Sequence, residues 1–196
     1  MAKNYNCGII RKHSNFNQIN GMRIYILSSF INNHKRFIEL AQSAYSITEH
    51  LCKDYPKYFE WYWSKEIPRV FHGTGEIVIC TINSIIVGVT FLKKDDVERK
   101  ICTFFVHEDY HGKHISSKML EYAFKYLGTT KPLITIADYK LPMFEPIIKK
   151  YNWKLNQTMR KGYYNTNSQE LVYNGKLPEW FLICQKNAYL KVQLNF

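Results

Sequence analysis

Residues 101–127 place a short apolar strand, a polar loop with one glycine and a helical pattern in immediate succession. The apolar run reaches Val106, and residues 109–117 form the loop. The first backbone N–H groups of a helix lack intrahelical partners, and the helix dipole adds partial positive charge at that end. A strand that leads through a glycine loop into a helix therefore builds a cradle for phosphates. This order predicts a loop that binds a phosphorylated cofactor or substrate.

The chain has 196 residues, of which 46% are hydrophobic and 16% aromatic. This length and composition predict one domain with a substantial core. We assign residues 1–20 to a polar N-terminal extension, 21–175 to the domain, and 176–196 to a C-terminal tail packed on it. The apolar runs are too short to cross a bilayer, and the N-terminus lacks the apolar stretch of a secretory signal.

The five cysteines are scattered along the chain without C-x-x-C spacing. An odd number of cysteines, mostly set in apolar runs, is typical of reduced thiols. The cysteines therefore predict a cytoplasmic protein and no metal site.

The formal net charge is +11, and the excess lies at the two ends of the chain. Residues 1–50 and 151–196 each carry six Lys/Arg against two acids, whereas residues 51–150 carry fifteen against twelve. Such a charge predicts attraction to nucleic acid, an acidic surface or a polyanionic ligand. A solvated surface of a lysine-rich composition is the alternative, and both interpretations stay open at this point.

Residue periodicity predicts strands and helices along the domain. Strands are expected at residues 22–27, 76–81, 85–92, 101–106, 133–137, 153–158 and 163–173, and helices at 30–47, 54–67, 115–127 and 141–151. Asn83 and Ser84 predict a tight hairpin turn between the second and third strands. Gly128 predicts the end of the third helix.

This order of elements resembles the GNAT superfamily of acyl-CoA-dependent N-acetyltransferases over about residues 22–175. The sequence-specific likeness is confined to residues 78–155. The family pattern at the loop is Arg/Gln-x-x-Gly-x-Gly/Ala, whose defining positions fall on His111, His114 and Ser116. Gly112 and Lys113 match residues common at the intervening positions. The departures from the pattern imply weaker cofactor binding, an unusual acyl donor or a loss of activity.

A second family signature, Asn-x-x-Ala-x-x-Leu-Tyr-x-x-x-Gly-Phe, aligns with residues 141–153. Ile148 stands in place of the tyrosine, and Asn152-Trp153 replaces Gly-Phe. The tyrosine that serves as an acid in the family is therefore missing from this chain.

The resemblance implies an α/β (α+β) fold, with a mixed, mostly antiparallel twisted sheet flanked by helices. Two splayed central strands would form the cleft for acetyl-CoA or another acyl-CoA. The strand end would pair with the pantetheine arm, and the loop and first helical turn would face the pyrophosphate. The residues implied to bind the cofactor are Phe105, Val106, His111, Gly112, Lys113, His114, Ile115, Ser116 and Ser117.

Acyl transfer to an amine needs a base for the nucleophile and an acid for the thiolate. Asp138 is the first candidate for the base because it follows an apolar strand, where burial would raise the pKa of a carboxyl group. His107, at the exit of the central strand, is a second candidate that would act through water. Tyr139 is the candidate acid. A helix cap at Asp138 and solvated loop positions for His107 and Tyr139 are the alternatives.

Aromatic residues are dense in the second predicted helix. Helical spacing favours core packing for the face with Phe59 and Trp63. Trp61 and Tyr62 then remain as candidates to stack against an aromatic or base-like acceptor.

The leading hypothesis is an N-acyltransferase in which the amine attacks the thioester directly. Its basic ends favour an acceptor associated with nucleic acid, such as a tRNA-linked amine, a nucleic-acid-binding protein or a base. One alternative is a GNAT-like DNA-modifying enzyme of Mom type that acts on adenine. The other is an inactive scaffold that binds nucleic acid or a protein partner.

Overall fold

The computed structural model describes residues 21–165 and 167–177. Seven strands form one sheet: β1 (Met22–Ile26), β2 (Gly75–Ile82), β3 (Ile85–Lys94), β4 (Arg99–Val106), β5 (Leu133–Ala137), β6 (Leu155–Met159) and β7 (Glu170–Tyr173). The α-helices are α1 (His34–Thr48), α2 (Tyr58–Trp61), α3 (Ile67–Phe71), α4 (Ile115–Leu127) and α5 (Leu141–Tyr151). The expected N-terminal extension and most of the expected tail lie outside the described residues.

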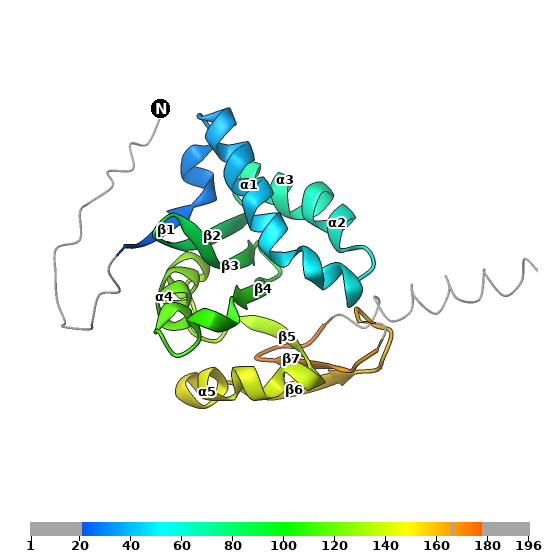
Figure 1. Cartoon of the computed structure of the whole chain (residues 1–196). Helices are drawn as coiled ribbons and strands as arrows, with labels where there is room; N and C mark the ends of the chain where they lie inside the picture. Colours follow the sequence, from blue (N-terminus) through cyan, green and yellow to red (C-terminus); the bar gives the residue numbers. More distant parts are fainter. Residues whose placement is uncertain (1–20, 166, 178–196) are drawn as a thin grey trace, which may run out of the picture.

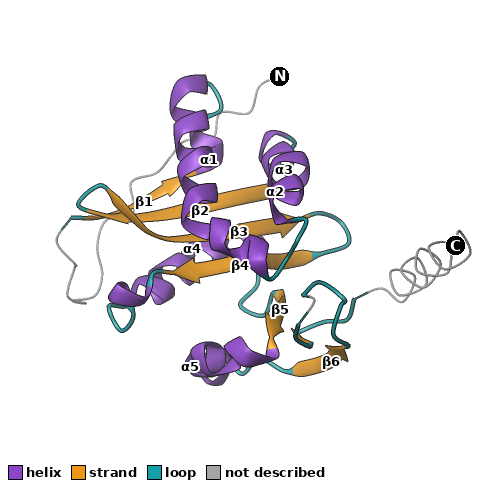
Figure 2. Ribbon diagram, turned by 45° about the vertical axis from the view of Figure 1, so that its right-hand side comes forward, coloured by secondary structure: helices purple, strands orange, loops and turns teal. Residues whose placement is uncertain are grey.

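The sheet has the order β1-β2-β3-β4-β5-β7-β6, and its central pair of strands is parallel. Every other neighbouring pair is antiparallel. Strands β4 and β5 pair only at Lys100–Leu133 and Ile101–Ile134. Beyond these residues the two strands diverge, so the expected splayed centre of a mixed, mostly antiparallel sheet is confirmed (Figure 2).

Helices cover both faces of the sheet (Figure 1). On one face, α1, α2 and α3 pack against β2 and β3 around Tyr62 and Phe91. On the other face, α4 and α5 pack against β4 and β5 around Ile101 and Leu120. The α4 helix lies close to β3 at Gly88, where an added Cβ would come within 2.8 Å of the Met119 sulfur.

Local turn signals in the sequence are confirmed. Asn83 and Ser84 both have positive φ, 50° and 68°, as a two-residue hairpin turn of the right twist requires. Gly128 ends α4 in the left-handed conformation with φ 71°. These short-range patterns could be predicted because a position in the left-handed conformation favours glycine or asparagine wherever it occurs.

The predicted helix over residues 54–67 is wrong in its start and in its continuity. Helix α2 begins at Tyr58, after a 3₁₀ helix at Glu49–Lys53, and Asp54 does not cap it. A wide π-helical segment, Tyr62–Glu66, then separates α2 from α3.

The last predicted strand, residues 163–173, is too long. A turn lies at its start: Gly162, which directly precedes the predicted strand, has φ 82°, and its N–H donates to the carbonyl of Asn165 over 2.8 Å. Only Glu170–Tyr173 pairs with β5 and β6. Among the described residues, no helix is both long and apolar enough to cross a membrane.

Candidate active site

A β-bulge in β4 lies where the central strands part. Phe91 pairs with Thr103 and Leu92 pairs with Ile101, so Cys102 is the extra residue on β4. The Thr90 hydroxyl donates to the carbonyl of Thr103 over 2.8 Å and holds the strand beyond the bulge against β3. A bulge bends its strand and increases its twist, which turns the end of β4 away from β5.

The divergence of β4 and β5 opens a cleft of about 1480 Å³. Its walls come from both strands, the loop and first turn of α4, the helix α5, and the segment around α2. Most small-molecule sites have volumes of ~300–1,000 Å³. The cleft therefore has room for a large ligand and for a second molecule beside it.

The loop before α4 presents backbone N–H groups to this cleft. Gly112 and His114 have φ 75° and 58°, α4 starts at Ile115, and the side chain of the N-cap residue, His114, does not cap the first turn. Ile115, Ser116 and Ser117 line the cleft, so the amides of an uncapped first turn open onto it. An uncapped helix N-terminus behind a left-handed loop fits a pyrophosphate.

The other residues expected to bind the cofactor divide into two groups. Phe105, Val106 and His111 line the cleft, and the His111 Nε2 atom lies 2.8 Å from the carbonyl oxygen of Val106. Lys113 does not line the cleft, and its Nζ atom lies 4.7 Å from the centre of the Tyr110 ring. Lys113 therefore contributes charge near the loop and not a wall of the cleft.

This geometry agrees with a sequence comparison in which residues 35–133 match the model of the acetyltransferase (GNAT) family. The chain belongs to the GNAT family. The fold matches a GNAT-family acetyltransferase from Desulfovibrio desulfuricans with a TM-score of 0.56 at 9% identity, over 78% of this chain and 96% of the other. It matches IAA acetyltransferase from Bacillus cereus ATCC 14579 with a TM-score of 0.51 at 13% identity, over 78% and 97% of the chains.

The match to nourseothricin acetyltransferase covers 52% of this GNAT chain and 65% of that protein, with a TM-score of 0.47 at 9% identity. This chain therefore spans somewhat less than two thirds of that relative. No curated protein sequence gives a significant match. Family membership supports an acetyltransferase with acetyl-CoA or another acyl-CoA as its acyl donor.

The residues expected to be catalytic lie beside the cleft and not in its wall. The Asp138 Oδ1 atom accepts a hydrogen bond from the backbone N–H of Tyr139 over 2.7 Å. The Tyr139 hydroxyl donates to Asp54, and the side chain is half exposed. His107 Nδ1 lies 3.4 Å from the N–H of Asp109, at the start of a 3₁₀ turn. None of the three lines the cleft, so we do not carry them into the proposed site.

Of the two expected acceptor residues, only Trp61 lines the cleft. Tyr62 is fully buried, and its hydroxyl donates to the carbonyl of Ala41 over 2.7 Å. The expected core face is also wrong, because Phe59 is 58% exposed while Tyr58 and Tyr62 are buried. Both pairs have helical spacing, so periodicity cannot choose between them.

Sequence reasoning missed Glu170, the first residue of β7. Its side chain is buried, and Oε1 accepts a hydrogen bond from the Tyr55 hydroxyl over 3.0 Å. Burial raises the pKa of Glu170 to about 7. The alternation in Glu170-Leu171-Val172 was an available signal, because it places the carboxylate on the same face as a buried valine.

His50 was also missed and lines the cleft, with its ring 5.0 Å from that of Phe105. Burial and then the nearby Lys140 lower the pKa of His50. The imidazole is therefore neutral at neutral pH and able to accept a proton.

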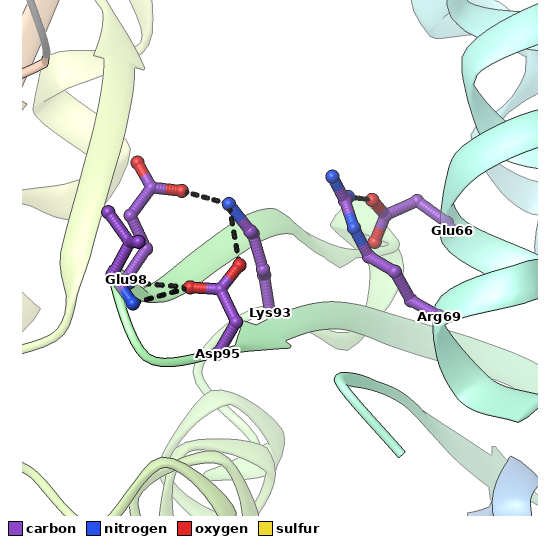
Figure 3. A network of polar contacts seen from close by, with 6 residues as sticks. Glu66, Arg69, Lys93, Asp95 and Glu98 are labelled. Carbon is purple, nitrogen blue, oxygen red and sulfur yellow. Dashed lines mark hydrogen bonds and ion pairs between the residues drawn. The ribbon is translucent and has the colours of Figure 1, made fainter. Parts of the chain in front are cut away.

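Positive side chains gather at the edge of the cleft next to α3. Lys93 Nζ lies 3.0 Å from Asp95 and 2.7 Å from Glu98, and Arg69 pairs with the buried Glu66 (Figure 3). Lysines and arginines in the walls outnumber acids seven to three: Lys57, Lys65, Arg69, Lys93, Lys100, Lys140 and Lys150 against Glu60, Asp95 and Glu98. The charged side chains in the cleft wall therefore carry a net positive charge, although Arg69, Lys93 and Lys140 form ion pairs.

Proposed function

We propose that this chain transfers an acyl group from acyl-CoA to an amine that enters the cleft from the side of α2. The observation that carries the proposal is that the splayed end of β4 and the uncapped first turn of α4 open into one cleft. The loop amides would hold the pyrophosphate, and the edge of β4 at Phe105 and Val106 that faces away from β3 would pair with the pantetheine arm. Trp61 would contact the acceptor.

The donor, when bound, supplies a thioester whose carbonyl carbon an amine can attack. As the new C–N bond forms and the C–S bond breaks, the protein must take a proton from the nitrogen and return one to sulfur. The cationic walls favour negative charge in both ligands.

Binding of acetyl-CoA, followed by calorimetry, tests the site directly. We expect the wild type to bind and Gly112→Asp to lose at least about tenfold in affinity, because the new carboxylate would face the phosphates. The added Cβ meets no atom within 4 Å, although the positive φ of 75° strains the backbone.

Gly73→Asp is the matched control for that strain. Gly73 has φ 71° and also meets no atom within 4 Å, but it follows α3 and is not in the wall of the cleft. Its acetyl-CoA affinity should equal that of the wild type. Equal losses in the two variants would contradict a phosphate site at Gly112, and a wild type that does not bind would remove the acyltransferase proposal.

We also propose that the acceptor amine belongs to a nucleic-acid-associated molecule. The net charge of +11 and the cationic cleft walls support this. Binding of duplex DNA and of tRNA, followed by fluorescence anisotropy, should weaken by about tenfold or more between ~50 and ~200 mM salt. Acetyl-CoA binding without salt-dependent nucleic-acid binding would point instead to a small or protein acceptor.

The same two assays separate the alternatives. A scaffold would bind nucleic acid in a salt-dependent way and have no affinity for acetyl-CoA. An adenine-modifying enzyme of Mom type is favoured by the rings of Tyr55, Tyr58 and Trp61 in the cleft wall, which could stack on a flipped base. It would prefer DNA that contains an unpaired adenine.

The free thiols of Cys52, Cys80 and Cys102 support our proposal that the reaction is cytoplasmic.

A further inference from the structure

Glu170 is a buried acid with one unused oxygen. The residue is 1% exposed, and it pairs across the sheet with Ala137 of β5 and Met159 of β6. Oε1 accepts the hydrogen bond from Tyr55, whereas Oε2 is buried and has no hydrogen-bond partner within the described part of the chain. A buried carboxylate with an unpaired oxygen is costly. Such groups call for an explanation, and catalysis is one of the recognised reasons.

The charges around Glu170 do not keep it ionised. The titratable groups that face it are Tyr55, Lys140, Lys100, Asp138, Tyr139 and Tyr164. Burial is the largest influence and raises the pKa of Glu170 to about 7, although the Tyr55 hydrogen bond and the two lysines act in the opposite direction. At neutral pH the carboxyl group therefore exists in both protonation states, as a proton carrier requires.

Tyr55 connects Glu170 with the cleft. Its side chain lines the cleft and donates its hydroxyl proton to Glu170. Burial first, and then the Glu170 carboxylate, raises the pKa of Tyr55. The hydroxyl therefore holds its proton and can release it to Glu170 only while it receives another from the cleft.

Resting on the proposed function, we propose that Glu170 is the proton acceptor for the amine and that Tyr55 relays the proton to it. As the amine nitrogen bonds to the acyl carbon, an N–H proton passes to the Tyr55 oxygen while the Tyr55 proton passes to Glu170. The bond from the acyl carbon to sulfur then breaks. The proton on Glu170 returns through Tyr55 to the thiolate, so that the amide and the free thiol form and the pair regains its starting state.

An infrared titration of the protein without any ligand tests the acid itself. Spectra of the wild type and of Glu170→Gln are recorded from about pH 5 to about pH 9 and subtracted. The difference spectrum should contain the band of a protonated carboxyl group at acidic pH, and this band should disappear with a midpoint near pH 7. Glu39→Gln, at an exposed position of α1, should leave this band in place. A wild type in which Glu170 shows no such band at acidic pH would overturn the proposal.

Acetyl-CoA hydrolysis tests the relay, with water as the probe nucleophile. Water must also lose a proton as it attacks the thioester, so the natural acceptor need not be known. We expect Glu170→Gln and Tyr55→Phe each to release the CoA thiol at least about tenfold more slowly than the wild type near pH 8. The rising limb of the wild-type pH profile, centred near pH 7, should disappear from Glu170→Gln. Glu39→Gln should match the wild type.

The outcomes separate this inference from the proposed function. A wild type that fails to bind acetyl-CoA in calorimetry removes the proposed function and the inference together. Binding without hydrolysis above the buffer rate, or with wild-type hydrolysis in both Glu170→Gln and Tyr55→Phe, overturns the inference alone. Loss of the pH-dependent limb in His50→Gln but not in Glu170→Gln would also overturn it, in favour of direct proton transfer to His50.

Discussion

Replacing Tyr62 by alanine is expected to lower the free energy of unfolding by about 3–5 kcal/mol. The side chain has no exposed surface, and its ring lies 5.4 Å from that of Tyr45 and 5.2 Å from that of Phe91. Alanine would leave a cavity between α1, the π-helical segment and β3, and the Ala41 carbonyl would lose the hydrogen bond from the Tyr62 hydroxyl. Urea unfolding followed by circular dichroism measures the loss.

Tyr62→Phe separates the hydroxyl from the ring. It keeps the packing and removes only the hydrogen bond to Ala41, so a loss of about 1 kcal/mol is expected. Phe59→Ala is the matched comparison on the neighbouring face, where a 58% exposed ring should contribute much less. If Phe59→Ala were the more destabilising of the two alanine variants, the core face would be that of Phe59 and Trp63 and not that of Tyr58 and Tyr62.

Glu170→Gln is expected to change how stability depends on pH. The pKa of Glu170 is raised from its ordinary value of 4.5 to about 7 in the folded protein, mainly by burial. A raised pKa means that the folded state binds the proton more tightly, so this contribution to stability is complete below about pH 4.5. It is lost as the pH rises through about 7. The free energy of unfolding of the wild type should therefore fall by about 2–3 kcal/mol relative to that of the glutamine variant between about pH 5 and pH 8.

Urea unfolding of both proteins across this pH range measures that difference, and all other titrating groups cancel because both chains share them. Glu39→Gln is the control for the removal of an exposed carboxyl group. A pH-independent difference between the wild type and Glu170→Gln would contradict a raised pKa at Glu170. The measurement does not depend on acyl-transfer activity and so stands apart from the proposed relay.

The local elements were predictable because each has its own short-range signal. The hairpin at Asn83 and Ser84, the end of α4 at Gly128 and the loop that includes Gly112 all depend on residues that tolerate positive φ. The proposed cofactor end of the site belongs to this class, because backbone amides at a helix start bind phosphate largely irrespective of side chains.

The acceptor end of the site was not predictable in this way. The expected base, Asp138, was chosen because it follows an apolar strand, but its carboxylate bonds to the next backbone N–H. Burial does raise the pKa of Glu170, whose partner Tyr55 lies 115 positions away along the chain. Nothing local to Glu170 reveals that partner.

By itself, the sequence determined the approximate order of the strands and helices, because hydrophobic period and turn chemistry act over a few residues. The splayed sheet was implied by the resemblance to the GNAT superfamily, and the phosphate loop stays a prediction. Tertiary structure alone decided which aromatic face of residues 58–66 is buried, where β4 bulges at Cys102, and that Tyr55 meets Glu170. These features depend on packing between distant segments. Burial in that packing, and not residue type, determines whether a carboxyl group can carry a proton at neutral pH.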